Sequence, residues 1–216
     1  MILQGLYGIV DPGLLDNSQD LIETVEEAIE GGVAILQLRD KNSPDGLLYE
    51  RALGLARICS ERDVLFVVNN RLDIALCSGA HGVHLGAEDL PVSVARRLSP
   101  TNFVIGASAG TLKRARQMES EGANYLGVGA LYEARASKAD ASAPKGTKII
   151  AEVSSNVGIP VFGIGGINAV NTADVIAAGA SGVAVIRAIF GSPSPGDAAR
   201  ELGLAIDRGR TLRQTR

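Results

Sequence analysis

The sequence of 216 residues has no tryptophan, only two cysteines and 4% aromatic side chains. With so few rings to stack on bases and a net charge of −3, we expect no nucleic-acid partner. Cys59 and Cys77 lack the paired spacing of a zinc or redox motif, and both are predicted to be reduced thiols in the core.

Long apolar runs are also missing. None approaches the ~18 residues that cross a bilayer. The first residues have neither the basic region nor the apolar region of a signal peptide. We therefore expect a cytoplasmic protein with no membrane partner.

Charge is unevenly spread along the chain. Residues 208–216 contain four arginines and no acid, so residues 1–207 alone carry a net charge of −7. We expect one folded domain over residues 1–207, followed by a solvated, disordered basic tail over residues 208–216.

Short apolar runs rich in valine, isoleucine and leucine recur along the chain, and each is typical of a buried strand. They lie at residues 6–10, 34–38, 64–68, 82–86, 103–107, 125–129, 160–164 and 182–186. Between them, segments such as 20–30, 45–61 and 111–121 have apolar residues every three or four positions, as one face of a helix requires.

Alternating buried strands and helices predict a parallel sheet covered by helices, which is either an open sheet or a closed barrel. Eight strands favour the closed (β/α)8 barrel of the α/β class. Ligands of such barrels bind where the strands end, so the residues that follow each strand are the candidates for function.

The second predicted strand is followed by two cations. Alternation along the strand places Gln37, Arg39 and Lys41 on one side. Inward charge at a barrel end is costly unless it meets an opposite charge, so we expect an anion such as diphosphate there. The alternative is an ion pair within the chain, with Asp40 or a carboxylate at the rim.

Polar residues also follow the third and fourth strands. Asn69 and Asn70 follow the third strand, and capping of the next helix is the alternative for Asn70. Glu88 and Asp89 lie beyond the fourth strand, where a hard cation such as Mg²⁺ could bind to their carboxylates, and capping of the next helix is the alternative for both. His81 and His84 are three residues apart on a strand and so face opposite sides, which argues against a metal-binding pair.

The remaining candidates follow the last four strands. Ser108 places one hydroxyl at the rim, and residues 131–145 form a long polar loop that is either a binding loop or a surface excursion. Gly165 and Gly166 allow close approach of a ligand to the backbone, and with the turn at Ile186 and Arg187 they predict a phosphate cradle. A tight turn without a ligand is the alternative.

Taken together, these segments resemble the thiamine phosphate synthase family, from about residue 7 to 207. The likeness is carried by residues 37–41 (QLRDK), 69–75 (NNRLDIA), 82–86 (GVHLG), 88–91 (EDLP), 106–108 (GAS), 125–129 (YLGVG) and 163–167 (GIGGI). The resemblance implies a single-domain TIM barrel enzyme. Its members join an aminopyrimidine-methyl diphosphate to a thiazole phosphate, and release diphosphate with the help of Mg²⁺.

The resemblance also assigns roles by position. It implies catalytic roles for Arg39, Lys41, Ser108 and Lys138, and Mg²⁺ ligation by Asp89 and Asn70. It implies substrate contacts for Gln37, Leu38, Arg39, Asp40, Lys41, Asn69, Ser108, Arg135, Ala136, Ser137, Lys138, Gly165, Gly166, Ile186 and Arg187.

Three positions depart from the family pattern. Asn70 stands where an aspartate is usual, Arg135-Ala136-Ser137 replaces a turn rich in hydroxyls, and Arg187 replaces a serine. These departures keep two alternatives open. One is a thiazole tautomerase, the nearest relative, although its usual histidine after the sixth strand is Ala130 here. The other is a non-catalytic protein that binds the thiazole phosphate. The sequence leaves open whether the chain forms a homo-oligomer.

Overall fold

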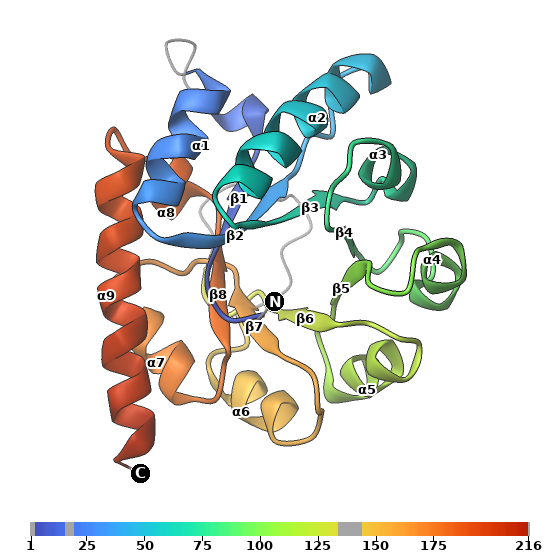
Figure 1. Cartoon of the computed structure of the whole chain (residues 1–216). Coiled ribbons are helices and arrows are strands. Elements are labelled where there is room, and N and C mark those ends of the chain that lie inside the picture. The colour runs from blue at the N-terminus through green and yellow to red at the C-terminus, as the bar shows by residue number, and fades with distance from the viewer. Residues whose placement is uncertain (1–2, 16–19, 134–143, 216) are drawn as a thin grey trace.

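The chain folds into a closed barrel of eight parallel strands surrounded by helices (Figure 1). The computed structural model describes residues 3–15, 20–133 and 144–215. The strands are β1 (Gly5–Val10), β2 (Val33–Leu38), β3 (Leu65–Asn69), β4 (Gly82–Leu85), β5 (Val104–Ser108), β6 (Tyr125–Val128), β7 (Val161–Ile164) and β8 (Gly182–Val185). Each expected strand matches its observed bounds to within one residue, and the predicted TIM barrel is confirmed.

A helix follows every strand. A short 3-10 helix, η1 (Pro12–Leu14), precedes the first of them. The helices are α1 (Leu21–Glu30), α2 (Asp45–Glu61), α3 (Leu72–Cys77), α4 (Val92–Leu98), α5 (Leu112–Ser120), α6 (Lys148–Ser154), α7 (Thr172–Ala177), α8 (Arg187–Phe190) and α9 (Pro195–Gln214). Each strand pairs in parallel with the next, and β8 pairs with β1 to close the ring.

Helix α1 shows how the local sequence sets these elements. Asp20 caps its start by accepting hydrogen bonds from the backbone N–H groups of Ile22 and Glu23. Gly31 caps the end of the helix, and Gly32 has a φ of +107°, a conformation that glycine adopts without strain. The chain can therefore turn at once into β2.

The core has two layers. The larger one fills the space between the barrel and the helices. The smaller one lies inside the barrel and consists of Tyr7, Ile9, Ile35, Leu65, Val67, Tyr125, Phe162 and Ala184. The barrel interior is therefore a packed core with no open channel, and it forms a floor beneath the strand ends.

The alternation of side chains along the strands decides which residues rise above that floor. Residues two positions beyond an inward side chain face inward as well. Ile9, Val67 and Ala184 face inward, as do Gln37, which contacts Tyr7, and Gly106, which contacts Tyr125. The next inward positions are Asp11, Arg39, Asn69, Ser108 and Ile186. Five strands thus direct their last inward residues to one end of the barrel.

Helix α9 corrects the expectation of a disordered tail, because it continues through the basic segment to Gln214. Gly209 is buried against α7, where an added Cβ would lie 2.6 Å from the carbonyl oxygen of Ala173. On the exposed side, Arg210 pairs with Asp207 at 3.0 Å. Close packing on one face and an ion pair on the other favour a continuous helix over a solvated tail.

The two cysteines differ. Cys59 is buried as expected, and burial raises the pKa of its thiol to about 12. Cys77 is exposed, which corrects its placement in the core: it is the last residue of α3 and lies on the outward side of that short helix.

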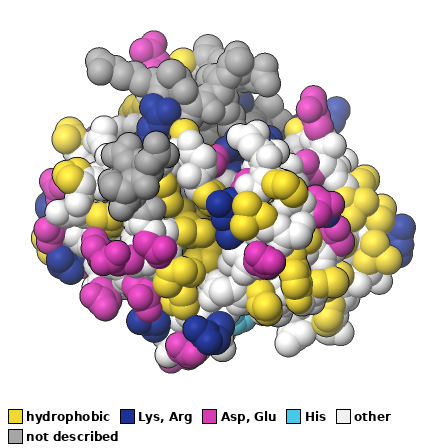
Figure 2. Space-filling view, turned by 90° about the horizontal axis from the view of Figure 1, so that it is seen from above, with side chains coloured by type: hydrophobic (Ala, Val, Ile, Leu, Met, Phe, Trp, Pro, Cys, Tyr) yellow, Lys and Arg dark blue, Asp and Glu magenta, His cyan; other side chains and the backbone are white. Residues whose placement is uncertain are grey.

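The surface agrees with the composition. On the face shown in Figure 2, lysine and arginine side chains are interspersed with aspartate and glutamate. Within the described residues, no helix is long and apolar enough to span a membrane.

Candidate functional site

Arg39 stands at the mouth of the barrel in an ion pair with a carboxylate at the rim. Its Nη1 atom donates to Oδ2 of Asp11, which follows β1. Asp11 is only 7% exposed, and its Oδ1 also accepts the backbone N–H of Gly13 at 3.1 Å. The structure therefore shows the ion-pair alternative, with Asp11 as the carboxylate at the rim. A guanidinium has five N–H donors, so Arg39 keeps further donors for an anion.

The other candidates at the end of β2 lie on different faces of the strand. Gln37 points into the barrel, where its Nε2 donates to the hydroxyl of Tyr7. Lys41 is exposed at the rim. Leu38 packs in the layer beneath the helices, so any contact it makes with a ligand would involve its main chain.

Asp40 faces away from the barrel interior and holds the loop before α2. Its carboxylate accepts from Arg51 at 2.6 Å and from the backbone N–H of Ser43 at 3.1 Å. Burial raises the pKa of Asp40, but hydrogen bonds from Ser43 and Arg51 outweigh that effect and keep the pKa below its ordinary value. Asp40 therefore stabilises the loop that carries Lys41.

Asn69, Asn70 and Asp89 lie at the ends of β3 and β4. The Asn69 Nδ2 atom donates to Oδ1 of Asn70 at 2.5 Å, and Asn70 has a φ of +66°, which asparagine tolerates. Asp89 accepts the backbone N–H of Gly86 at 2.6 Å rather than capping α4. Its carboxylate thereby folds back over the end of β4.

This set of donors suits magnesium better than a softer metal. The side chains at these strand ends offer oxygen atoms to a cation, from the Asp89 carboxylate and the Asn69 and Asn70 amides. Among the described residues, no cluster of three or more histidine, cysteine, aspartate or glutamate side chains could hold a metal. Mg²⁺ is commonly bound by one or two carboxylates together with substrate phosphates and water, and the residues present fit that pattern.

Ser108 is linked to a histidine that sequence reasoning missed as a site residue. Its Oγ lies 3.1 Å from Nε2 of His84, whose Nδ1 is 3.1 Å from the hydroxyl of Tyr125. His81 lies at the opposite end of β4, where its Nδ1 accepts the backbone N–H of Phe66 at 3.0 Å. The two histidines are thus separate, as their spacing predicted. The available signal was that His84 faces inward toward the same end as Ser108.

The described end of the loop after β6 contacts the segment that follows the neighbouring strand β5. The Lys145 Nζ atom donates to the carbonyl oxygen of Gly110 at 2.5 Å, which ties the end of the loop to the segment after β5. The predicted site residues Arg135, Ala136, Ser137 and Lys138 lie outside the described residues.

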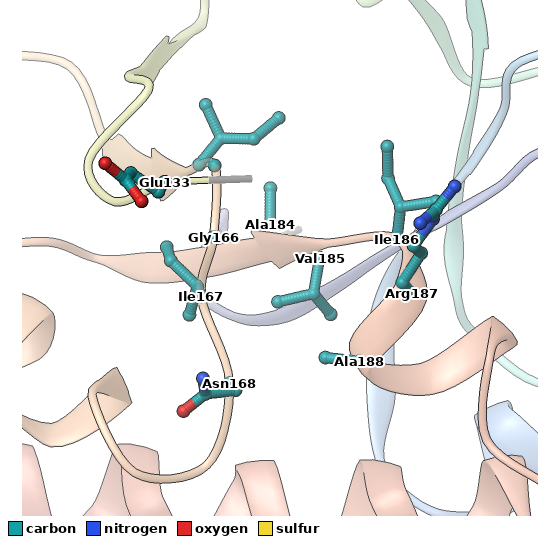
Figure 3. A pocket seen from close by; sticks show the side chains of 11 residues that line it. Glu133, Gly166, Ile167, Asn168, Ala184, Val185, Ile186, Arg187 and Ala188 are labelled. Atoms are coloured by element: carbon teal, nitrogen blue, oxygen red, sulfur yellow. The ribbon is translucent and has the colours of Figure 1, made fainter. Parts of the chain in front are cut away.

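A pocket of about 430 Å³ lies at the ends of β7 and β8, where the sequence predicted a phosphate cradle. Figure 3 shows Glu133 and Arg187 at opposite sides of it, with Ile186 beside Arg187. Gly165 and Gly166 form its wall with φ angles of +96° and +66°. A Cβ on Gly166 would lie 2.8 Å from the carbonyl oxygen of Glu133, so the turn requires glycine.

The mouth and the pocket share one floor. Ile164 and Ile186 line the pocket and also pack against the core inside the barrel. Fold and site together define a (β/α)8-barrel protein of the class that binds its ligands at the carboxyl ends of the strands.

Comparison with known proteins narrows this class. A family model described as thiamine monophosphate synthase matches residues 6–189. The thiamine-phosphate synthase of Methanospirillum hungatei is 45% identical over 91% of this chain and 95% of its own. That of Haloarcula marismortui is 47% identical over 87% and 90%. A solved thiamine phosphate pyrophosphorylase from Pyrococcus furiosus is 37% identical, with a TM-score of 0.86 over 95% and 96%. The chain belongs to the thiamine monophosphate synthase family.

Proposed function

We propose that the chain transfers the 4-amino-2-methylpyrimidinyl-methyl group from its diphosphate to the ring nitrogen of a thiazole phosphate, giving thiamine phosphate and diphosphate. The observation that supports this most strongly is the 45% identity to a thiamine-phosphate synthase over 91% of the chain. In this proposal the pyrimidine diphosphate would bind at the mouth and the thiazole phosphate in the neighbouring pocket.

The chemistry explains why cations stand at the mouth. If the C–O bond breaks before the thiazole nitrogen attacks, the pyrimidine becomes a stabilised cation and negative charge collects on the departing diphosphate. Arg39, Lys41 and the Ser108 hydroxyl would bind that charge as it develops. In other enzymes each fixed donor of this kind stabilises the transition state by about 3 kcal/mol. Because the thiazole nitrogen itself attacks the cation, no protein side chain has to act as a nucleophile.

Magnesium would be held by Asp89 and Asn70, and the diphosphate would complete its ligands. When bound, Mg²⁺ supplies further positive charge to the leaving group. Asn70 brings an amide oxygen and no charge, so the protein contributes one carboxylate at most from this pair.

The thiazole phosphate would occupy the pocket at β7 and β8. Backbone N–H groups beside Gly165 and Gly166 and the Arg187 guanidinium would bind its phosphate. The apolar floor beneath, with Ile164 and Ile186, would keep water away from the pyrimidine cation. The substrate nitrogen then meets the cation without competition from solvent.

The direct test is a product assay with purified protein, Mg²⁺ and both substrates. Thiamine phosphate and diphosphate should appear in equal amounts. No product at saturating Mg²⁺, with the circular dichroism of a folded barrel, would reject the proposal. Calorimetric binding of the thiazole phosphate in that case would favour the binding protein, and its isomerisation without diphosphate substrate would favour the tautomerase.

A further inference from the structure

A chain of hydrogen bonds crosses the barrel interior beneath the mouth, and the mechanism above uses only its last member, Ser108. Gln37 Nε2 donates to the Tyr7 hydroxyl, and the Tyr7 and Tyr125 hydroxyls are 2.8 Å apart. The Tyr125 hydroxyl lies 3.1 Å from His84 Nδ1, and His84 Nε2 lies 3.1 Å from Ser108 Oγ. The chain thus links five strands, from β2 through β1, β6 and β4 to β5.

Glycines on β5 and β6 leave space for the rings of this hydrogen-bond chain. A Cβ on Gly106 would lie 2.1 Å from the ring of Tyr125, and one on Gly127 would lie 3.2 Å from the ring of His84. Tyr7 is 1% exposed and Tyr125 is fully buried. The rings therefore have one position each, and the hydroxyls cannot turn to water for other partners.

The first member fixes the direction of the whole chain. An amide nitrogen only donates, so the Tyr7 oxygen accepts from Gln37, and the Tyr7 O–H is left to donate a hydrogen bond to the Tyr125 oxygen 2.8 Å away. The Tyr125 O–H is then left to donate to His84 Nδ1, which lies 3.1 Å away. A neutral His84 then carries its proton on Nε2 and donates to Ser108 Oγ.

The direction of this hydrogen-bond chain requires Tyr7 and Tyr125 to keep their phenolic protons. Burial raises the pKa of Tyr7 and of Tyr125 well above the ordinary value for tyrosine. Each hydroxyl therefore donates one hydrogen bond at neutral pH and accepts another.

We infer that Tyr125 is a positioning residue that, together with Tyr7, fixes the tautomer of His84 and so turns the Ser108 proton toward the leaving group. Ser108 accepts from His84 and has its own O–H left to donate toward the mouth. In the reverse direction Ser108 would donate inward and present a lone pair to an anion, which would repel it. This role for Ser108 depends on the proposed function, whereas the direction of the chain does not.

Nitrogen-15 NMR of the ligand-free protein shows which ring nitrogen of His84 carries the proton, and it requires no enzymatic turnover. The polypeptide has two histidines. His81 serves as an internal reference, because the Phe66 N–H occupies its Nδ1 and leaves the proton on Nε2. We expect His84 to show the same pattern, with bare Nδ1 and protonated Nε2. Protonation of Nδ1 in the wild-type protein would overturn the inference.

Two substitutions test the direction. Tyr125→Phe removes the donor to Nδ1 and should give His84 a mixture of tautomers, with His81 unchanged. Gln37→Glu replaces the donor by an acceptor and should reverse the chain, so that the His84 proton moves to Nδ1. The second variant decides the question if the first fails to fold. An unchanged His84 spectrum in a folded variant would refute the inference.

Kinetics separate positioning from general damage. Removing the outer hydrogen-bond partner of a metal-bound histidine typically lowers metal affinity or activity by 10- to 100-fold. By analogy, we expect Tyr125→Phe to lower kcat by about that factor, with KM for the pyrimidine diphosphate changed less than about twofold. Tyr49→Phe, on α2 outside the barrel, is the matched control and should change neither value. A rise in KM at constant kcat would contradict a role in the reaction step. Absence of product in the wild-type protein with the expected spectrum would reject the proposed function alone.

Discussion

Replacing Arg39 with alanine would separate its structural role from its proposed catalytic role. The substitution lowers the free energy of unfolding, because it leaves the Asp11 carboxylate without its partner. Breaking a buried ion pair in this way costs about 3–5 kcal/mol. The side chains of Arg39 and Asp11 are 17% and 10% exposed, which favours the lower figure. About 3 kcal/mol of unfolding free energy corresponds to a Tm lower by about 6–12 °C in a domain of this size.

The catalytic loss has a different origin. Under the proposed function, Arg39 donates to a leaving group whose negative charge is greatest in the transition state. One such donor is worth about 3 kcal/mol, and at ~1.4 kcal/mol per decade its removal lowers kcat by roughly 100-fold. The assay is steady-state formation of thiamine phosphate, at a temperature well below the Tm of the variant.

The double variant Asp11→Asn with Arg39→Ala distinguishes the two roles. Removing the charge of Asp11 relieves the unpaired carboxylate, so Tm should recover most of its loss. Turnover should stay roughly 100-fold low, because no guanidinium faces the diphosphate. If turnover recovers together with Tm, or if Arg39→Ala alone has wild-type kinetics, the placement of the diphosphate is wrong.

Four further predictions concern other parts of the molecule. Gly166→Ala strains a backbone with a φ of +66° and should raise KM for the thiazole phosphate about tenfold; an unchanged KM would contradict the cradle. Asn70→Asp adds a charge and should lower the Mg²⁺ concentration at half-maximal rate by about tenfold, and an identical metal titration would exclude Asn70 as a ligand. The pKa of Asp40 is lowered in the fold, so its contribution to stability is present above about pH 4 and lost as the pH falls; Asp40→Asn should therefore weaken the pH dependence of urea unfolding between about pH 5 and pH 3. Gly106→Ala should cost about 3 kcal/mol of unfolding free energy. The control Gly203→Ala, which meets no atom within 4 Å in α9, should stabilise by up to about 1 kcal/mol, and equal effects of the two would refute the close contact at Gly106.

The fold could be predicted from the sequence because its signals are local. Buried parallel strands are continuous apolar runs, and the helices between them repeat apolar residues every three or four positions. Residues 45–61 were expected to form a helix, and α2 has those bounds. The tail at 208–216 could not be judged from its charge, because burial of Gly209 against α7 depends on how distant elements pack.

The site was predictable only in part. Its candidates were found from their positions after the strands, and the structure directs Arg39, Asn69 and Ser108 to one end of the barrel. Most partners of these residues were not found. Tyr7 and Tyr125 are 118 residues apart, and only closure of the barrel brings their hydroxyls together. A carboxylate at the rim was expected as the alternative partner of Arg39, but the sequence did not identify it as Asp11, because that residue follows a different strand.

Helix α9 has a consequence for how the protein is made. It packs on α1, α7 and β1, and an added Cβ on Gly31 would lie 2.3 Å from the carbonyl oxygen of Gly196, so the first and last thirds of the polypeptide fit closely together. During translation the contacts of α9 with α1, α7 and β1 can form only after α9 has left the ribosome. Until then the nascent chain exposes the apolar surface that α9 covers, where chaperones can bind and premature association can occur.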